Sequence, residues 1–229
     1  LSQPRQLTLN QVMEIDAATR RNLELTMTLS GERKGSLLSV MDRTLSSSGA
    51  RLLASHLAAP LRDPAEVDVR LDMVQFFVEG ERIAADVRSA LKRCPDIERA
   101  LSRLSLRRGG PRDLGTIRDG LQLGMNLRSA LEDPSLSNLP KGIASAIKGL
   151  GHHGDVIEHL ARALAEELPF YARDGGFIAQ GFAAELDEAR SLRDESRRLI
   201  ARLQSRYVDE TGVGTLKVKH NNVLGYFVE

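Results

Sequence analysis

The sequence has 229 residues, of which 41% are hydrophobic, 28% charged and 4% aromatic, without Trp. This composition supports one good core built mainly from Leu, Ala, Ile and Val. The formal net charge of +1 gives no overall attraction to nucleic acid or membrane, so any electrostatic function must come from local clusters.

The cysteine count and the lengths of the apolar runs indicate further which class of protein this is. The single Cys94 excludes an internal disulfide framework, and its helical spacing from Val87 and Leu91 favours core packing over a nucleophile. No apolar run approaches the roughly 18 residues that a membrane span needs, and residues 1–10 lack a signal-peptide core. The sequence therefore predicts a soluble, intracellular chain.

The first third of the chain predicts short elements. Residues 7–15 suggest an extended segment, residues 31–35 a charged loop, and brief helices follow Asp16, Ser36 and the Ser47-Ser48-Gly49 segment. A firmer helix begins where Asp63 can cap, Pro64 suits the first position and Glu66 completes a capping box. Gly80 ends it.

Three further helices are expected before residue 134. Ile83, Val87, Leu91 and Cys94 line one that ends before Pro95, and Ile97, Leu101 and Leu104 line the next, up to Gly109-Gly110. Pro111 opens a third, which contains Gly115, Gly120 and Gly124. Glycines weaken a helix unless another helix approaches closely, and we expect close approach.

The following segment is richer in turns. Residues 134–140 read as a connection, and residues 141–154 contain a possible helical turn at 143–147. Asp155 with Glu158 predicts a capping box and a helix with Leu160, Leu164 and Leu168 on one face, up to Pro169. The residues Asp174-Gly175-Gly176 predict a tight turn.

A long polar helix and a short hairpin complete the chain. Apolar residues recur every three or four positions from Leu186 to Tyr207 without Gly or Pro, which predicts a helix over 183–208, about 39 Å long. After Thr211-Gly212 the period changes to two, and His220-Asn221-Asn222 is expected to form the turn before Leu224, Tyr226 and Val228. The predicted lever residues that pack this helix are Leu192, Leu199, Leu203 and Tyr207.

Together these elements predict a mainly α fold: a helical bundle with one long protruding helix and a small β-hairpin at the C-terminal end. A long helix and a two-stranded hairpin are each marginal alone. We therefore expect their partner beyond Glu229, in a longer protein.

Motifs for catalysis are weak. Residues 31–36 lack the spacing and the lysine of a phosphate loop, and Ser47-Ser48-Gly49 has no flanking strand that would make it a nucleophile elbow. His153 and His159 fall on different helical faces, which disfavours a metal site. The sequence predicts no catalytic residue, no metal site and no cofactor bound by this chain.

The remaining chemistry is cationic. Arg198, Arg202 and Arg206 form a stripe, either because cations suit a helix C-terminus or because they contact phosphate. On the hairpin, Lys217, Lys219, His220 and Asn221 are candidate contacts to a DNA backbone, without base readout.

The hairpin also carries a family resemblance. Thr211-Gly212 and residues 216–229, LKVKHNNVLGYFVE, resemble the entry to the clamp of MutS-type DNA mismatch repair proteins. The resemblance extends upstream, in order, through residues 13–16, 19–25, 35–38, Asp42, Thr44, 49–53, 60–61, 96–99, 111–114, 175–176, Ile178, Gly181 and 185–190.

The resemblance implies a core and lever domain over 1–207 and the start of a clamp over 208–229. It implies that this region is not an enzyme, whereas the full-length parent is a DNA-dependent ATPase that uses ATP and Mg²⁺. Expected partners are double-stranded DNA, a second copy of the parent in a homodimer and a MutL-type repair protein, with no membrane. The expected location is the bacterial cytoplasm, at the nucleoid when bound to DNA.

Two alternatives remain open at this point. A MutS relative could act on recombination intermediates instead of mismatches, and the presence or absence of a mismatch-reading domain would decide. The chain could also be a helical scaffold that binds only proteins, which duplex binding by a protein with the whole clamp would exclude.

Overall fold

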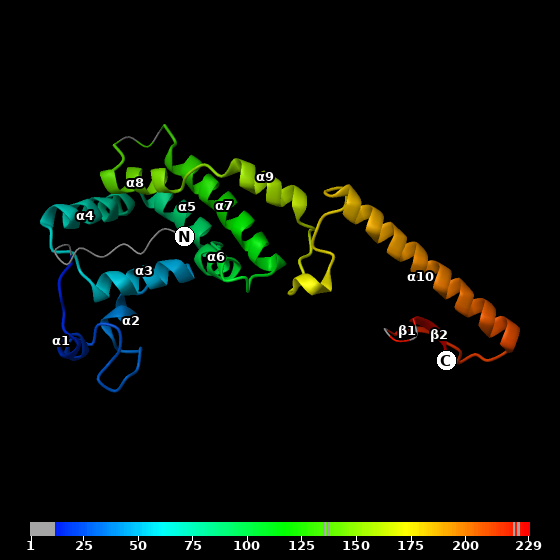
Figure 1. The fold of residues 1–229 in the computed structure, drawn as a ribbon. Coiled ribbons are helices and arrows are strands. Elements are labelled where there is room, and N and C mark those ends of the chain that lie inside the picture. The colour runs from blue at the N-terminus through cyan, green and yellow to red at the C-terminus, as the bar shows by residue number, and fades with distance from the viewer. Residues whose placement is uncertain (1–11, 135, 137, 222, 224) are drawn as a thin grey trace. The chain divides into compact units, whose positions relative to one another are not determined.

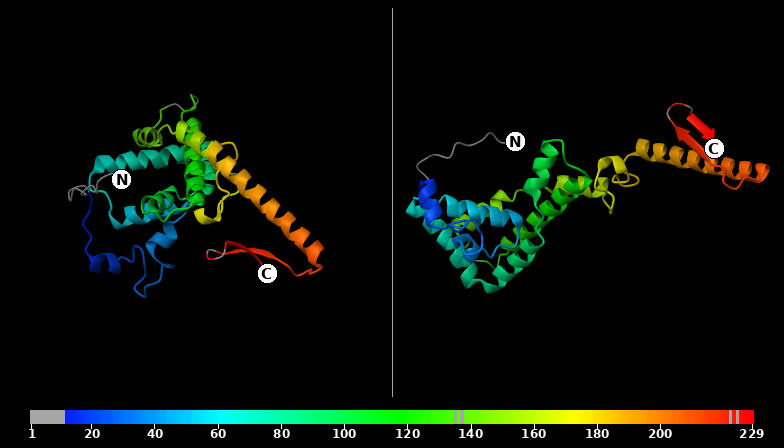
Figure 2. Two further views of the ribbon diagram at one scale, coloured as in Figure 1. Left: turned by 45° about the vertical axis from the view of Figure 1, so that its right-hand side comes forward. Right: turned by 90° about the horizontal axis from the view of Figure 1, so that it is seen from below.

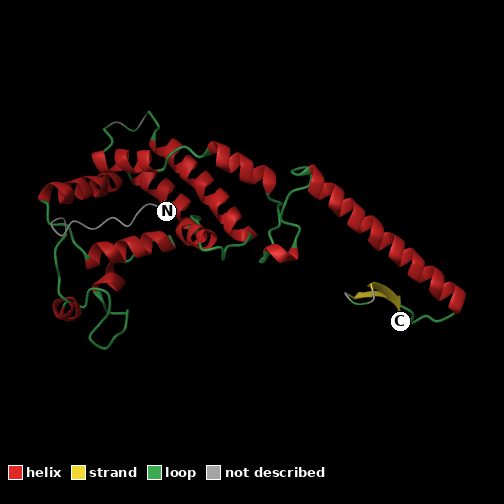
Figure 3. Cartoon of the chain, in the orientation of Figure 1, coloured by secondary structure: helices red, strands yellow, loops and turns green. Residues whose placement is uncertain are grey.

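The computed structural model describes residues 12–134, 136, 138–221, 223 and 225–229 (Figure 1). Helices dominate these residues, and the strands form one small antiparallel hairpin near the C-terminus (Figure 3). The mainly α fold with a C-terminal hairpin is therefore confirmed. By its internal contacts the chain divides into two units, Leu1–Phe177 and Ile178–Glu229, and each is described by itself. The predicted division between lever and clamp at 207/208 stays a prediction.

Most of the elements follow one another along the chain with short connections; the longer stretches lie between α1 and α2 and between α9 and α10. The helices are α1 (Ala17–Asn22), α2 (Leu37–Met41), α3 (Ser47–Ala58), α4 (Pro64–Glu79), α5 (Glu81–Lys92), α6 (Ile97–Ser105), α7 (Pro111–Leu131), α8 (Lys141–Gly149), α9 (Gly154–Ala163), the 3₁₀ turn η1 (Ala172–Asp174) and α10 (Ala184–Thr211). The strands are β1 (Val218–Asn221) and β2 (Gly225–Val228).

Side-chain caps begin the early helices where the sequence placed them. Asp16 accepts a hydrogen bond from the Thr19 N–H, and Ser36 accepts one from the Ser39 N–H. The predicted extended segment before α1 is confirmed only at Val12, which forms an antiparallel bridge with Leu61; residues 13–15 form no strand. Residues 7–11 of that prediction lie outside the described residues.

The first hydrophobic core joins α4, α5, α7 and α8. Leu131 from α7 and Ile143 and Ile147 from α8 are buried together. Partly buried side chains pack around them: Met73, Phe76, Phe77, Ile83, Val87 and Leu139. Burying these groups stabilises the bundle by roughly 25 cal/mol per Å² of apolar surface removed from water.

Helix α7 contacts both α6 and α9, and its glycines permit the approach. A Cβ at Gly120 would lie 2.3 Å from Ile97 Cδ1, and one at Gly115 would lie 2.6 Å from Leu168 Cδ1. The prediction of close helix approach is confirmed at Gly120, because Ile97 belongs to α6; at Gly115 the close neighbour, Leu168, lies in the segment after α9. At Gly124 it is wrong, because the nearest atom, Leu150 Cδ2, lies 3.8 Å away at ordinary van der Waals distance.

The segment after α7 differs from expectation at two helices. The possible turn at 143–147 is a complete helix, α8, and α9 ends at Ala163 instead of continuing through Leu168. Leu164 is buried with an extended backbone, and the next N–H, that of Ala165, donates to the Phe177 carbonyl at 2.8 Å. The predicted cap at Asp155 is also wrong, since this residue lies inside the first turn of α9.

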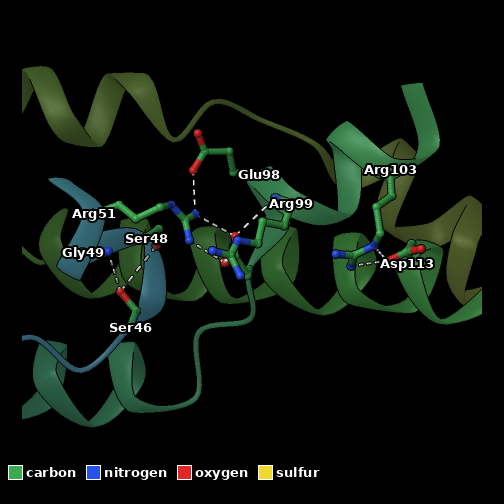
Figure 4. Close-up of polar contacts among 9 residues, drawn as sticks. Ser46, Ser48, Gly49, Arg51, Glu98, Arg99, Arg103 and Asp113 are labelled. Carbon is green, nitrogen blue, oxygen red and sulfur yellow. Dashed lines mark hydrogen bonds and ion pairs between the residues drawn. The ribbon is translucent and has the colours of Figure 1, made fainter. Parts of the chain in front are cut away.

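An ion-pair network ties α3 to the start of α6 (Figure 4). The Arg51 guanidinium forms two parallel hydrogen bonds to the Asp96 carboxylate, at 2.7 and 2.8 Å, and a third to Glu98 at 2.6 Å. Asp96 also caps α6 by accepting from the Arg99 N–H. The guanidinium hydrogen bonds lower the pKa of Asp96 from 3.8 to about 2.

We expect acid to weaken this tie. Because the folded-state pKa of Asp96 is depressed, its contribution to stability is present above its ordinary value of 3.8 and is lost as pH falls toward about 2. The substitution Asp96→Asn keeps a helix cap but removes the charge, so the urea midpoint should decline less between these pH values. Urea unfolding at a series of pH values measures this. Asp68→Asn is the control, since Asp68 is exposed and forms no ion pair with any described residue; an unchanged pH profile for Asp96→Asn would contradict the assignment.

Candidate nucleic-acid interface

Helix α10 has 28 residues and is about 42 Å long at 1.5 Å per residue. It runs without interruption in each view of Figure 2. Gly212 ends it in the left-handed conformation at φ +67°, and its N–H donates to the Val208 carbonyl. The predicted long helix is confirmed and extends about one turn beyond the expected end at Val208.

The four predicted lever residues differ in exposure. Leu203 and Tyr207, near the C-terminal end of α10, are half-buried, as are the neighbouring Gln204 and Val208. Leu192 and Leu199 are 59% and 63% exposed. The apolar stripe is thus covered at one end of the helix and open along its middle, and its role in a lever stays a prediction.

Most arginines of α10 are paired with acids on the same helix. Arg190 bonds Asp187 at 3.1 Å, and Arg206 pairs with Glu210 at 3.3 Å. Asp194 forms ion pairs with both Arg193 and Arg197, and the hydrogen bond from Arg193 lowers the pKa of the Asp194 carboxyl. In the predicted stripe, the pair with Glu210 favours a helix-stabilising role for Arg206. Arg198 and Arg202 are exposed and form no ion pair with a described residue, so for them the choice between helix stabilisation and phosphate contact stays a prediction.

The hairpin register separates the side chains into two faces. Val218 lies opposite Val228, Lys219 opposite Phe227, His220 opposite Tyr226 and Asn221 opposite Gly225. Directly paired residues share a face and neighbours along a strand alternate. Lys217, Lys219 and Asn221 therefore lie on one face, called here the lysine face, and His220 lies on the other.

The predicted turn is wrong for two of its three residues. His220 and Asn221 belong to β1, and the third, Asn222, lies outside the described residues. The Asn221 side-chain oxygen accepts from the Val223 N–H at 3.0 Å, and Gly225 begins β2 at φ +70°. Asn221 therefore supports the turn from its strand position.

A helix side chain holds the hairpin to α10. The Val218 N–H donates to Gln204 Oε1 at 3.0 Å, and β1 packs on this part of the helix. Gln204 belongs to the half-buried row of Leu203, Tyr207 and Val208. The hairpin thus covers the end of the stripe that the sequence assigned to a lever partner.

Charge on the lysine face is partly neutralised. Lys219 pairs with Glu229, and this hydrogen bond lowers the pKa of the Glu229 carboxyl. Lys217 is exposed and forms no ion pair with a described residue. On the opposite face, the His220 and Tyr226 rings meet edge to face at 4.8 Å. On the lysine face, Lys217 is consequently more open to a phosphate than Lys219.

Sequence reasoning missed Gln204 and Glu229. Gln204 gave no signal because a glutamine on a polar helix is common, and Glu229 could be paired with Lys219 only after the register was known. Among the described residues, no cluster of His, Cys, Asp or Glu could hold a metal ion, and no helix is long and apolar enough to cross a membrane.

Comparison with known proteins identifies the family. A model of MutS domain III matches residues 18–212. The chain belongs to the MutS family. The match covers the bundle and α10 up to the Gly212 cap, and it confirms the resemblance predicted from the sequence.

Relatives support the assignment along the whole length. The DNA mismatch repair protein MutS of Rhodopseudomonas palustris BisB5 is 52% identical over 230 residues, which cover 100% of this chain and 25% of that protein. The MutS proteins of Rhizobium meliloti and Roseobacter denitrificans are 53% and 51% identical, over 94% and 100% of this chain and 23% and 26% of theirs. The chain spans about a quarter of the length of these curated MutS relatives.

Proposed function

We propose that this chain is the core and lever region of a MutS-type DNA mismatch repair protein and that it grips duplex DNA without taking part in catalysis. Identity of about half over the chain to proteins named DNA mismatch repair protein MutS supports this role over one in recombination. The observation that carries the DNA-binding part is the placement of Lys217 and Lys219 on one face of a hairpin at the end of α10.

The lysine face suits contact with phosphates more than base reading. Its cations stand on a two-stranded hairpin and contact phosphate oxygens as point charges, which confers affinity without sequence information. Such contacts release counterions, so binding weakens with salt. His220, which meets the Tyr226 ring edge to face on the opposite face, would not reach the same phosphates.

Helix α10 is proposed to act as a stiff lever. A continuous helix without Gly or Pro transmits displacement along its axis, and its arginines are largely neutralised by neighbouring acids. The exposed Leu192 and Leu199 would pack on another helix of the complete protein. In that protein the lever would connect the DNA grip to an ATPase.

The ATP that drives the complete protein would bind outside the described residues. Ser36, not a lysine, follows Gly35, and the buried Ser36 hydroxyl donates to the Arg33 carbonyl at 2.7 Å, so residues 31–36 do not fit a phosphate loop. ATP and Mg²⁺ would accordingly bind another domain of the complete protein. Homodimerisation and binding of a MutL-type partner would likewise be properties of the complete protein.

Neutralising the lysines tests the grip. We expect Lys217→Gln to weaken binding to matched and mismatched duplex alike, by about fivefold, and to lower the salt slope by about one, because one phosphate contact is lost. Lys219→Gln should have a smaller effect, since Glu229 already offsets part of that charge. Fluorescence anisotropy on the complete protein at several salt concentrations measures both.

The double substitution Lys141→Gln and Lys148→Gln is the control, because both lysines are exposed on α8 of the other unit. A loss in the double variant that is, per lysine removed, as large as the loss in Lys217→Gln would mean that only total charge matters. An effect of Lys217→Gln confined to mismatched duplex would also contradict a backbone contact.

A further inference from the structure

A basic cavity lies in the first unit, away from the residues used above. It has a volume of about 520 Å³ and is formed where the turn between α6 and α7 meets the segment before η1. The residues that carry its chemistry are Arg103, Arg108, Arg112, Asp113, Phe170 and Tyr171. This volume falls in the range of small-molecule pockets, about 300–1,000 Å³.

The cavity has a surplus of positive charge. Its carboxylate, Asp113, is held by Arg103 (Figure 4), which lowers the Asp113 pKa. The same carboxylate also accepts a hydrogen bond from the Gly110 N–H at 2.9 Å. Asp113 is thus occupied by Arg103 and by the backbone N–H of Gly110, the N-cap residue of α7. Arg108 is exposed and forms no ion pair with any described residue.

Arg112 is held in place without using its charge. Its Nε donates to the Leu168 carbonyl at 3.0 Å, and its guanidinium lies 4.7 Å from the centroid of the Phe170 ring. The two terminal nitrogens of this fork have no carboxylate partner among the described residues. A fixed, unpaired guanidinium is pre-organised to bind an oxyanion through two hydrogen bonds.

Two exposed aromatic rings border these cations. Phe170 and Tyr171 are 65% and 54% exposed, with their ring centroids 5.6 Å apart. Arg173 lies over the Tyr171 ring at 4.5 Å, as Arg112 does over Phe170. Exposed rings interleaved with guanidinium groups offer stacking surfaces for a planar base next to its phosphate.

We propose that this cavity binds a nucleotide unit, with the phosphate on Arg108 and Arg112 and the base against Phe170 or Tyr171. A phosphate alone would use the arginines and leave the adjoining rings without a role, and an acidic peptide would do the same. The ligand's source is either a free nucleotide or an unpaired DNA strand. This site is independent of the hairpin grip, because it lies wholly within the first unit.

Binding of dTMP, a short oligodeoxythymidylate and inorganic phosphate, measured by calorimetry, tests the site. The protein carries Lys217→Gln and Lys219→Gln throughout, so that hairpin contacts do not contribute. We expect Arg108→Gln to weaken dTMP and oligonucleotide binding about tenfold, the loss of one charge-assisted contact. Phe170→Ala should weaken both about fivefold and leave inorganic phosphate unaffected, because only stacking is lost.

Arg62→Gln is the matched control, since Arg62 is exposed, lies in a loop of the same unit and does not line the cavity. Comparable binding of dTMP and the oligonucleotide identifies a free-nucleotide site, and binding of the oligonucleotide alone identifies a strand site. The proposal is overturned if neither binds, if Arg108→Gln matches Arg62→Gln, or if oligoglutamate binds as tightly as the oligonucleotide. Circular dichroism confirms folding of each variant, whose replaced side chains are exposed.

Discussion

The substitution Gly120→Ala is expected to destabilise the first unit by about 1–3 kcal/mol, the usual cost of overpacking a well-packed core. The new Cβ would lie 2.3 Å from both Ile97 Cδ1 and Cγ1, and 3.2 Å from Pro95 Cγ. Ile97 is β-branched and stiff, and it is the first residue of α6, so relief requires that α6 move away from α7. Urea unfolding of the whole chain measures the loss.

Gly124→Ala is a control on the same helix with the opposite expected sign. Its Cβ would meet Leu150 Cδ2 at 3.8 Å, so the higher helix propensity of Ala should stabilise by up to about 1 kcal/mol. In the double variant Gly120→Ala with Ile97→Ala, space is released for the added methyl, and the two losses should not add. Additive losses, or stabilisation by Gly120→Ala alone, would contradict the close contact between α6 and α7.

Local chemistry made much of the fold predictable. The caps at Asp16 and Ser36 and the stop at Gly212 depend on residues within a few positions of one another, so the sequence shows them directly. The same holds for the length of α10, because an uninterrupted apolar period without Gly or Pro is a strong helical signal.

The predictions from sequence that proved wrong or missed a contact are those in which tertiary contacts decide the structure. Leu164 continues the helical spacing of α9, yet it is buried in extended backbone because the chain there pairs with the segment around Phe177. Arg51 and Asp96 are 45 positions apart, and no local pattern links them. On the hairpin, a shift of the expected turn moved His220 and Asn221 into β1 and so onto opposite faces.

The candidate site was therefore predicted in part. The lysines were identifiable as a cluster, but their neutralisation depends on register: Lys219 reaches Glu229 only because the two residues lie diagonally on one face. Nothing in the sequence indicated the basic cavity, because Arg108 and Phe170 are 62 positions apart in it. They line the same cavity only through the packing of α7 against α9. Charge clusters that are assembled by tertiary contacts can be identified only from the structure.

Breaking α10 at its middle is expected to uncouple nucleotide state from DNA release in the complete protein. Leu199→Pro removes a helical hydrogen bond and kinks the helix, at about 3 kcal/mol, so displacement at one end would no longer reach the other. ATP-triggered release from a mismatched duplex, followed by stopped-flow fluorescence, should slow by about tenfold or more, since the stiff connection is lost. ATP binding should be unchanged, because ATP is proposed to bind in another domain.

Leu199→Ala is the control for the side chain: the helix is retained, and the only change is to shorten a side chain that is exposed in this chain and is proposed to pack on another helix of the complete protein. If both variants release DNA at the wild-type rate, stiffness of α10 does not carry the coupling; if both are equally slow, the side chain of Leu199 carries it through packing.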